Sequence, residues 1–251
     1  MTMRMLTIFL LGATCSVFAS EPTGVERVDG LLSTQGKLIF QDDFNRKESD
    51  DAKEELGKNW VTNSKKRAKG VKQADLTGES VMITMAKVAN HGVSMRHDAP
   101  FDDGVVQVRF RMFDPKGIGF NFNDPKCKVS HAGHICHFGV KPEDVTFRDG
   151  KTGMFDLKIR AKKQAGATKA ETAKLLKGTL THKEVNLELA KWHVMTLLIQ
   201  GDVMTTWLNG TLIGSMKSPG INHAVKQNLA FAVSGRAEVD DVKIWKLTAK
   251  E

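Results

Sequence analysis

The segments GVVQVRFRMF at residues 104–113 and GIGFNFN at residues 117–123 decide the fold class. In both, every second residue is apolar and the residues between are small or polar. Side chains of a β-strand point alternately to its two faces, so this period of two predicts two half-buried strands. The residues expected to face the core are Val106, Val108, Phe110, Met112, Ile118, Phe120 and Phe122. The polar residues expected on the other side are Gln107, Arg109, Arg111, Asn121 and Asn123.

Short strand signals with frequent turns continue along the rest of the chain. Asn209-Gly210 is a strong two-residue hairpin signal, because both positions tolerate positive φ. Further strands are expected at residues 37–41, 80–87, 136–140, 144–148, 154–160, 192–200, 203–208, 211–216, 229–233 and 238–247. One helical insertion at 162–183 interrupts them, with a capping-box spacing at Thr168 and Glu171. The pattern predicts an all-β protein, an antiparallel β-sandwich or jelly roll with one short inserted helix.

The N-terminal residues indicate export. Arg4 precedes a short apolar run, and Val17 and Ala19 fit the small-residue positions of a signal-peptidase site. The run is shorter than the roughly 20 apolar residues of a spanning helix, and no later segment could span a membrane. We therefore expect a signal peptide at 1–19, a linker at 20–36, a sandwich domain at 37–251, and a periplasmic or extracellular protein.

The net charge and the cysteines bear on partners and on redox chemistry. The chain carries a net charge of +8, which suits acidic polysaccharide, nucleic acid or an anionic surface, and equally suits ordinary lysine-rich solubility. No nucleic-acid motif accompanies the charge, so no nucleic-acid partner is expected. In an exported protein the pair Cys127 and Cys136 predicts a disulfide.

Three segments resemble a known family. They are WHVMTLLIQGDVMTTWLNGTLIG at 192–214, AEVDDVKIW at 237–245 and LIFQDDF at 38–44. Together they resemble the 3-keto-disaccharide hydrolase domain family of the concanavalin A-like lectin/glucanase superfamily. The resemblance implies a concanavalin A-like jelly roll and an activity on carbohydrate. The Glu-x-Asp-x-x-Glu motif of family-16 glucanases is absent, since Lys243 stands where its second Glu would be.

The segment between residues 123 and 137 concentrates the groups that could carry chemistry. Asp124, His131 and His134 are the candidate catalytic residues, because a histidine exchanges protons near neutral pH and a carboxylate can orient it. A catalytic metal held by His and Asp, and a loop whose polar groups satisfy its own backbone, are the alternatives. The candidate sugar-binding residues are Arg109, Arg111, Asn121, Asn123 and His137, which would share one cleft with the catalytic group if the loop borders the strands.

Acidic residues also flank the first and last strands, which should pair. Asp43 and Asp241 are candidate ligands of a structural calcium ion, the one cofactor that the sequence suggests; the alternative is edge charges that discourage aggregation. The leading hypothesis is an exported glycoside hydrolase of the 3-keto-disaccharide type. Its rivals are a non-catalytic sugar-binding or surface-interaction domain and a purely structural sandwich. The expected partner is an oligo- or polysaccharide, with acidic glycans among the candidates.

Overall fold

The computed structural model describes residues 24–248, which form two antiparallel β-sheets packed face to face. The first sheet has the strand order β13-β12-β11-β6-β15-β4-β3, and β1 pairs with the far half of β15. Its strands are β1 (Gly36–Asp42), β3 (Ala74–Leu76), β4 (Val81–Thr84), β6 (Gly104–Met112), β11 (His193–Gln200), β12 (Val203–Leu208), β13 (Thr211–Lys217) and β15 (Arg236–Leu247).

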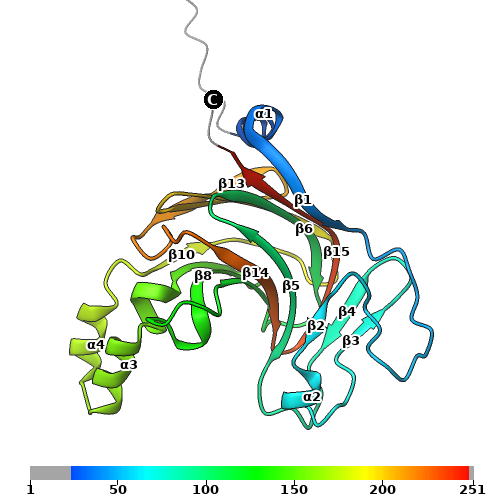
Figure 1. Cartoon of the computed structure of the whole chain (residues 1–251), viewed down its shortest axis with the longest axis horizontal. Coiled ribbons are helices and arrows are strands. Elements are labelled where there is room, and N and C mark those ends of the chain that lie inside the picture. The colour runs from blue at the N-terminus through cyan, green and yellow to red at the C-terminus, as the bar shows by residue number, and fades with distance from the viewer. Residues whose placement is uncertain (1–23, 249–251) are drawn as a thin grey trace, which may run out of the picture.

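The second sheet has the strand order β10-β9-β8-β7-β14-β5-β2. Its strands are β2 (Val61–Thr62), β5 (Val93–Phe101), β7 (Ile118–Asn123), β8 (His134–Val140), β9 (Asp144–Asp149), β10 (Leu180–Glu184) and β14 (Lys226–Val233). Both sheets curve in the same sense, and the second lies on the inner side of the arch (Figure 1). We therefore call the first the convex sheet and the second the concave sheet.

The core lies between the sheets and follows from the alternation in the sequence. Phe110 of β6 and Phe120 of β7 are fully buried, with ring centroids 5.6 Å apart across the interface. All seven apolar residues expected to face the core are at most 2% exposed. Burial of this many aromatic and branched side chains is the main stabilising term for such a sandwich.

A second, smaller apolar cluster lies on the outer face of the convex sheet. Helix α1 (Glu26–Gln35) covers Val105 and Trp207 there, and its own Val28 is 1% exposed. Part of the segment expected as a linker is therefore a helix. The expected signal peptide at 1–19 lies outside the described residues.

The expected strands correspond to β1, β4, β6–β9 and β11–β15, which confirms the antiparallel sandwich. The strand expected at 154–160 is wrong. Residues Gly150–Met154 form a π-helical turn, η2, and α3 (Leu157–Gln164) follows, because the Asp156 side chain caps the Ile159 amide. A second helix, α4 (Lys169–Leu175), starts with the predicted capping box. Short α2 (Ser64–Arg67) and a 3-10 turn, η1 (His131–Gly133), complete the fold. Between residues 24 and 248, no helix is long and apolar enough to cross a membrane.

Candidate functional site

The outer face of the concave sheet carries a groove at the end of β7 where Gly119 lies. Its volume is about 220 Å³. Small residues from three neighbouring strands, Gly119, Gly139 and Ala232, form its floor. A Cβ atom at Gly139 would lie 2.7 Å from the Thr146 hydroxyl, so a side chain there would crowd the floor. Backbone is therefore accessible to a ligand along the floor.

Polar and charged side chains border this floor. They are Lys116, Lys141, Asp144, Thr146, Arg148, His182 and Ser234. Asp144 is the single carboxylate among the residues lining the groove, and the ring of His182 contacts it, with Nδ1 3.1 Å from a carboxylate oxygen. The border thus offers mainly hydrogen-bond donors, with three cations against one anion.

The middle of the same face is occupied by a network of amides and imidazoles. Asn123 donates from Nδ2 to the Asn228 side chain over 2.9 Å, so its Oδ1 is the atom that accepts from Nδ1 of His134 over 2.7 Å. His137 Nδ1 lies 2.8 Å from Asn121 Oδ1 in the same way. Four of the expected site residues therefore lie together: Asn121, Asn123, His134 and His137. Their side chains form hydrogen bonds with one another.

Burial keeps both of these histidines neutral. Desolvation lowers the pKa of His134 to about 4 and that of His137 to about 3, and the positive charge of neighbouring groups acts in the same direction. The ring of Phe155, just after η2, lies 4.1 Å from that of His134 and 5.2 Å from that of His137, between centroids. His137 Nε2 is buried without a hydrogen-bond partner beneath η2, where a Cβ added at Gly150 would approach it to 3.0 Å. In this conformation neither ring nitrogen of His137 is open to a ligand, because Nδ1 contacts Asn121 and Nε2 is buried; its sugar-binding role stays a prediction that this geometry does not favour.

The expected catalytic group of Asp124, His131 and His134 does not form. Asp124 instead accepts from Nε2 of His223, 2.9 Å away, and from the amide of Lys126. Burial opposes its ionisation, but these two hydrogen bonds outweigh burial and lower the pKa of Asp124. His131 stacks on Phe155, on the outside of the loop. Sequence reasoning missed His223 because it is 99 residues from Asp124, in a loop before β14 without a motif.

Arg109 and Arg111 do not share this face. They lie on β6 and their side chains are on the outer face of the convex sheet. Asn121 and Asn123 lie on β7 and their side chains are on the outer face of the concave sheet. The prediction of one cleft is wrong because consecutive alternating strands were assigned to one sheet, and the sandwich places them in opposite sheets. Arg109 pairs with Asp240 at 2.8 Å and Arg111 with Glu238, beside a polar pocket of about 700 Å³.

Trp192 stacks on both of these arginines. The Arg109 and Arg111 guanidinium carbons lie 4.1 and 4.5 Å from its ring centroid. Arg109 and Arg111 are thus engaged on two sides, by a carboxylate and by an aromatic ring, which holds their planes in place.

The expected disulfide is also wrong, because both cysteines are free thiols. Cys136 lies on the inner face of β8 in the core, and Cys127 lies in the turn after Asp124. Burial raises the pKa of the Cys136 thiol to about 12, so it is a packed apolar group rather than a reactive one.

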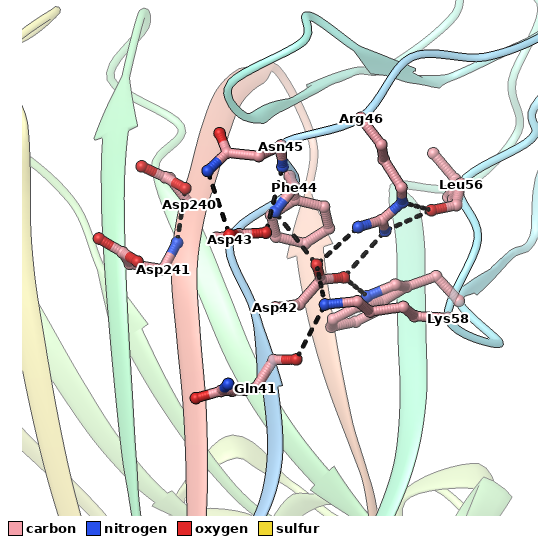
Figure 2. A network of polar contacts seen from close by, with 11 residues as sticks. Gln41, Asp42, Asp43, Phe44, Asn45, Arg46, Leu56, Lys58, Asp240 and Asp241 are labelled. Atoms are coloured by element: carbon pink, nitrogen blue, oxygen red, sulfur yellow. Dashed lines mark hydrogen bonds and ion pairs between the residues drawn. The ribbon is translucent and has the colours of Figure 1, made fainter.

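The ends of the first and last strands meet as expected. Gln41 and Asp42 pair with Lys243 and Val242, which places Asp43 and Asp241 around one small pocket (Figure 2). The Asp43 carboxylate accepts from the backbone and side chain of Asn45. Within residues 24–248, no group of three or more His, Cys, Asp or Glu side chains is placed to hold a metal ion. Calcium binding by Asp43 and Asp241 stays a prediction that this geometry does not favour.

No protein-family model matches the sequence, and no curated protein matches it significantly. Solved structures do share the fold. A variant of SCLam, a non-specific endo-β-1,3(4)-glucanase from family GH16 co-crystallised with 1,3-β-D-cellotriosyl-glucose, superposes with a TM-score of 0.55 at 12% identity, over 84% of this chain and 95% of that chain. The laminarinase from Rhodothermus marinus gives 0.54 at 12% identity, over 85% and 98%.

A third structure with the same fold has no stated activity. It is a Bacillus subtilis protein of unknown function with a galectin-like fold, with a TM-score of 0.53 at 10% identity over 85% of this chain and 99% of that chain. At such identities the likeness shows the fold alone. The chain is a β-sandwich of the concanavalin A-like lectin and glucanase fold.

Proposed function

We propose that this chain is an exported carbohydrate-binding protein and that a saccharide lies in the groove of the concave sheet. The observation that carries the proposal is the composition of this groove: glycines form its floor, and side chains that donate hydrogen bonds form its border. Sugar hydroxyls need donors and acceptors at fixed positions, and Arg148, Lys141 and Thr146 provide them along one edge. Because Gly119 and Gly139 have no side chains, the floor offers backbone against which a pyranose ring can lie.

Binding is favoured over hydrolysis because the groove lacks paired carboxylates. Glycosidases generally place two carboxyl groups about 5–9.5 Å apart around the scissile bond. Asp144 is the single acid among the groove-lining residues, and His182 contacts it. The outward positions of β7 are Gly119, Asn121 and Asn123, none of which can serve as a general acid.

The test is titration calorimetry with laminaritetraose and cellotetraose. Arg148→Ala should weaken binding about tenfold, the loss of one hydrogen bond from a charged donor. Lys243→Ala removes one cation from the opposite sheet and is the matched control. The groove is not the site if the wild-type chain binds neither tetraose and no acidic oligosaccharide. The same conclusion follows if Arg148→Ala and Lys243→Ala lose affinity equally.

A second candidate function rests on the hydrogen bond between Asp124 and His223. Asp124 accepts from Nε2 of His223, so in the neutral imidazole Nδ1 is the nitrogen whose lone pair can act as a base. This arrangement, with the resemblance to 3-keto-disaccharide hydrolases, supports cleavage of a glycosidic bond at the Asn123 end of β7. Turnover of a 3-keto-disaccharide by the wild-type chain, abolished in His223→Ala and retained in His131→Ala, would establish hydrolysis and replace the binding proposal.

A further inference from the structure

The insertion between β9 and β10 holds most of the net positive charge of the chain. Residues 157–178, here called the basic insertion, contain seven Lys or Arg residues and one Glu, a net charge of +6 against +8 for all 251 residues. The helices α3 and α4 make up most of it and project beside one end of the arch (Figure 1). The charge of the protein is therefore concentrated on one small element.

The cations of the basic insertion face solvent. Helix α4 has no buried residue, and α3 buries Ile159 alone. Among the described residues, no Lys or Arg of the insertion takes part in an ion pair, and Glu171 is used by the capping box with Thr168. Like charges this close repel each other, and an anionic partner would relieve that repulsion.

The basic insertion is connected to two strands, β9 and β10, that border the proposed saccharide groove. Arg148, at the end of β9, borders the groove and pairs with Leu180, the first residue of β10. The chain leaves the sheet just after Arg148 and returns at Leu180, so the whole insertion is rooted at that edge of the groove. A hollow of about 620 Å³ between α3 and α4, lined in part by Lys162 and Lys174, extends the cationic surface outward.

We propose that the basic insertion binds the carboxylate or sulfate groups of an acidic polysaccharide whose chain continues from the groove. The inference rests on the proposed function and names the class of its ligand. A linear glycan can occupy the groove and then reach the helices, because the chain leaves the groove-lining strand β9 just after Arg148 and leads through η2 to α3. Membrane insertion would need a continuous apolar face, but α3 and α4 are short and rich in lysine. The continuity with the groove favours a glycan over a nucleic acid.

The experiment compares two variants with the same change in charge. The first carries Lys162→Glu, Lys163→Glu, Lys169→Glu and Lys174→Glu, all at exposed positions of the insertion. The matched control carries Lys65→Glu, Lys66→Glu, Arg67→Glu and Lys69→Glu, also exposed, around α2. Helix α2 lies at the opposite end of the arch (Figure 1). The probes are polygalacturonate, dextran sulfate, neutral dextran, a DNA duplex and phosphatidylglycerol vesicles, measured by biolayer interferometry in 50 mM and 500 mM salt.

The insertion variant should bind polygalacturonate or dextran sulfate at least about tenfold more weakly in 50 mM salt, and the difference should shrink in 500 mM salt, where charges are screened over a few ångströms. The control variant should keep its affinity. Equal losses in both variants would overturn the proposal, because net charge alone would then explain binding. Tighter binding of a DNA duplex or of phosphatidylglycerol vesicles than of either acidic glycan would also overturn it.

Failure of this inference and failure of the proposed function give different results. If the groove binds tetraoses and the insertion variant retains full affinity for the acidic glycans, the inference alone is wrong. If Arg148→Ala has no effect on any saccharide while the insertion variant loses the acidic glycans, the groove assignment is wrong. In that case the insertion binds polyanions by itself, and the acidic glycan does not continue from the groove.

Discussion

Replacing Asp42 with alanine should destabilise the sandwich far more than the same change at its neighbour Asp43. The Asp42 side chain is fully buried and accepts from Nε1 of Trp60 at 2.7 Å, from both terminal nitrogens of Arg46 at 2.6 and 2.9 Å, and from the Phe44 amide (Figure 2). It thereby joins the end of β1 to the loop that follows it. Asp43 is exposed and contacts Asn45 alone among its described hydrogen-bond partners.

The magnitude follows from what Asp42→Ala leaves behind. The Trp60 indole N–H loses its partner in the core, and the Arg46 guanidinium, whose side chain is 23% exposed, loses its counter-charge. Removing one partner of a buried pair costs about 3–5 kcal/mol, and the partial exposure of Arg46 reduces this to about 3 kcal/mol. For a domain of this size that corresponds to a fall in Tm of roughly 6–12 °C. Asp43→Ala should change the free energy of unfolding by less than about 0.5 kcal/mol.

The assay is urea unfolding of both variants, followed by fluorescence at neutral pH and at pH values down to 3. Burial opposes the ionisation of Asp42, but Arg46, the Phe44 amide and Trp60 outweigh burial and lower its pKa. A carboxyl with a lowered pKa stabilises the fold above its unfolded-state pKa, near 3.9, and this stabilisation is lost as the pH falls below that value. The gap between wild type and Asp42→Ala should therefore narrow at the acid end. A loss below about 1 kcal/mol at neutral pH, or equal losses at Asp42 and Asp43, would refute the assigned role.

Three further predictions concern the concave sheet, the thiols and the basic insertion. Burial lowers the pKa of His137 to about 3, so below about pH 6.5 the unfolded chain takes up a proton there and the native chain does not. Stability should therefore fall by about 1.4 kcal/mol per pH unit from this group, and acid titrations of His137→Gln should lose this contribution and keep that of His134. The free thiols of Cys127 and Cys136 should make Tm independent of reductant, and mass spectrometry should find Cys136 unalkylated until the protein unfolds. Thr168→Ala should cost the insertion about 1 kcal/mol of local stability by removing its cap, visible as faster hydrogen exchange in α4 with unchanged exchange in β8.

The fold was largely predictable because its signal is local. The alternation in β6 and β7 gives the two faces of each strand, and the Asn209-Gly210 turn gives a hairpin directly. Strand β5 was missed although burial alternates from Val93 to Phe101, because His97 stands at an inward position and Pro100 is unfavourable in a strand. Edge strand β10 was missed because it has little burial and four of its five residues are exposed.

The candidate site was predictable only in part, because it depends on which strands become neighbours. Asn121 and His137 come together as register partners, since β7 and β8 are consecutive in the chain and in the sheet. The pairing of Asp124 with His223 depends on β14 inserting between β7 and β5, which no local pattern reveals. The error at Arg109 and Arg111 has the same cause. The inward and outward faces of their strand, β6, are predicted correctly, but β6 belongs to the other sheet.

The network on the concave face offers an argument about function that does not depend on the groove. Glycosidases generally place two carboxyl groups around the scissile bond, whereas Asn121 and Asn123 occupy the outward positions of β7. Asn123 holds His134 and Asn121 holds His137 through side-chain oxygens, with both rings kept neutral by burial. A carboxylate at Asn121 would instead favour a protonated His137 and place an ion pair under η2, where desolvation opposes both charges. The neutral amides therefore suit a rigid, uncharged network beside which a ligand is held, and the Asp–His contacts of this sheet, Asp124 with His223 and Asp144 with His182, lie outside that network.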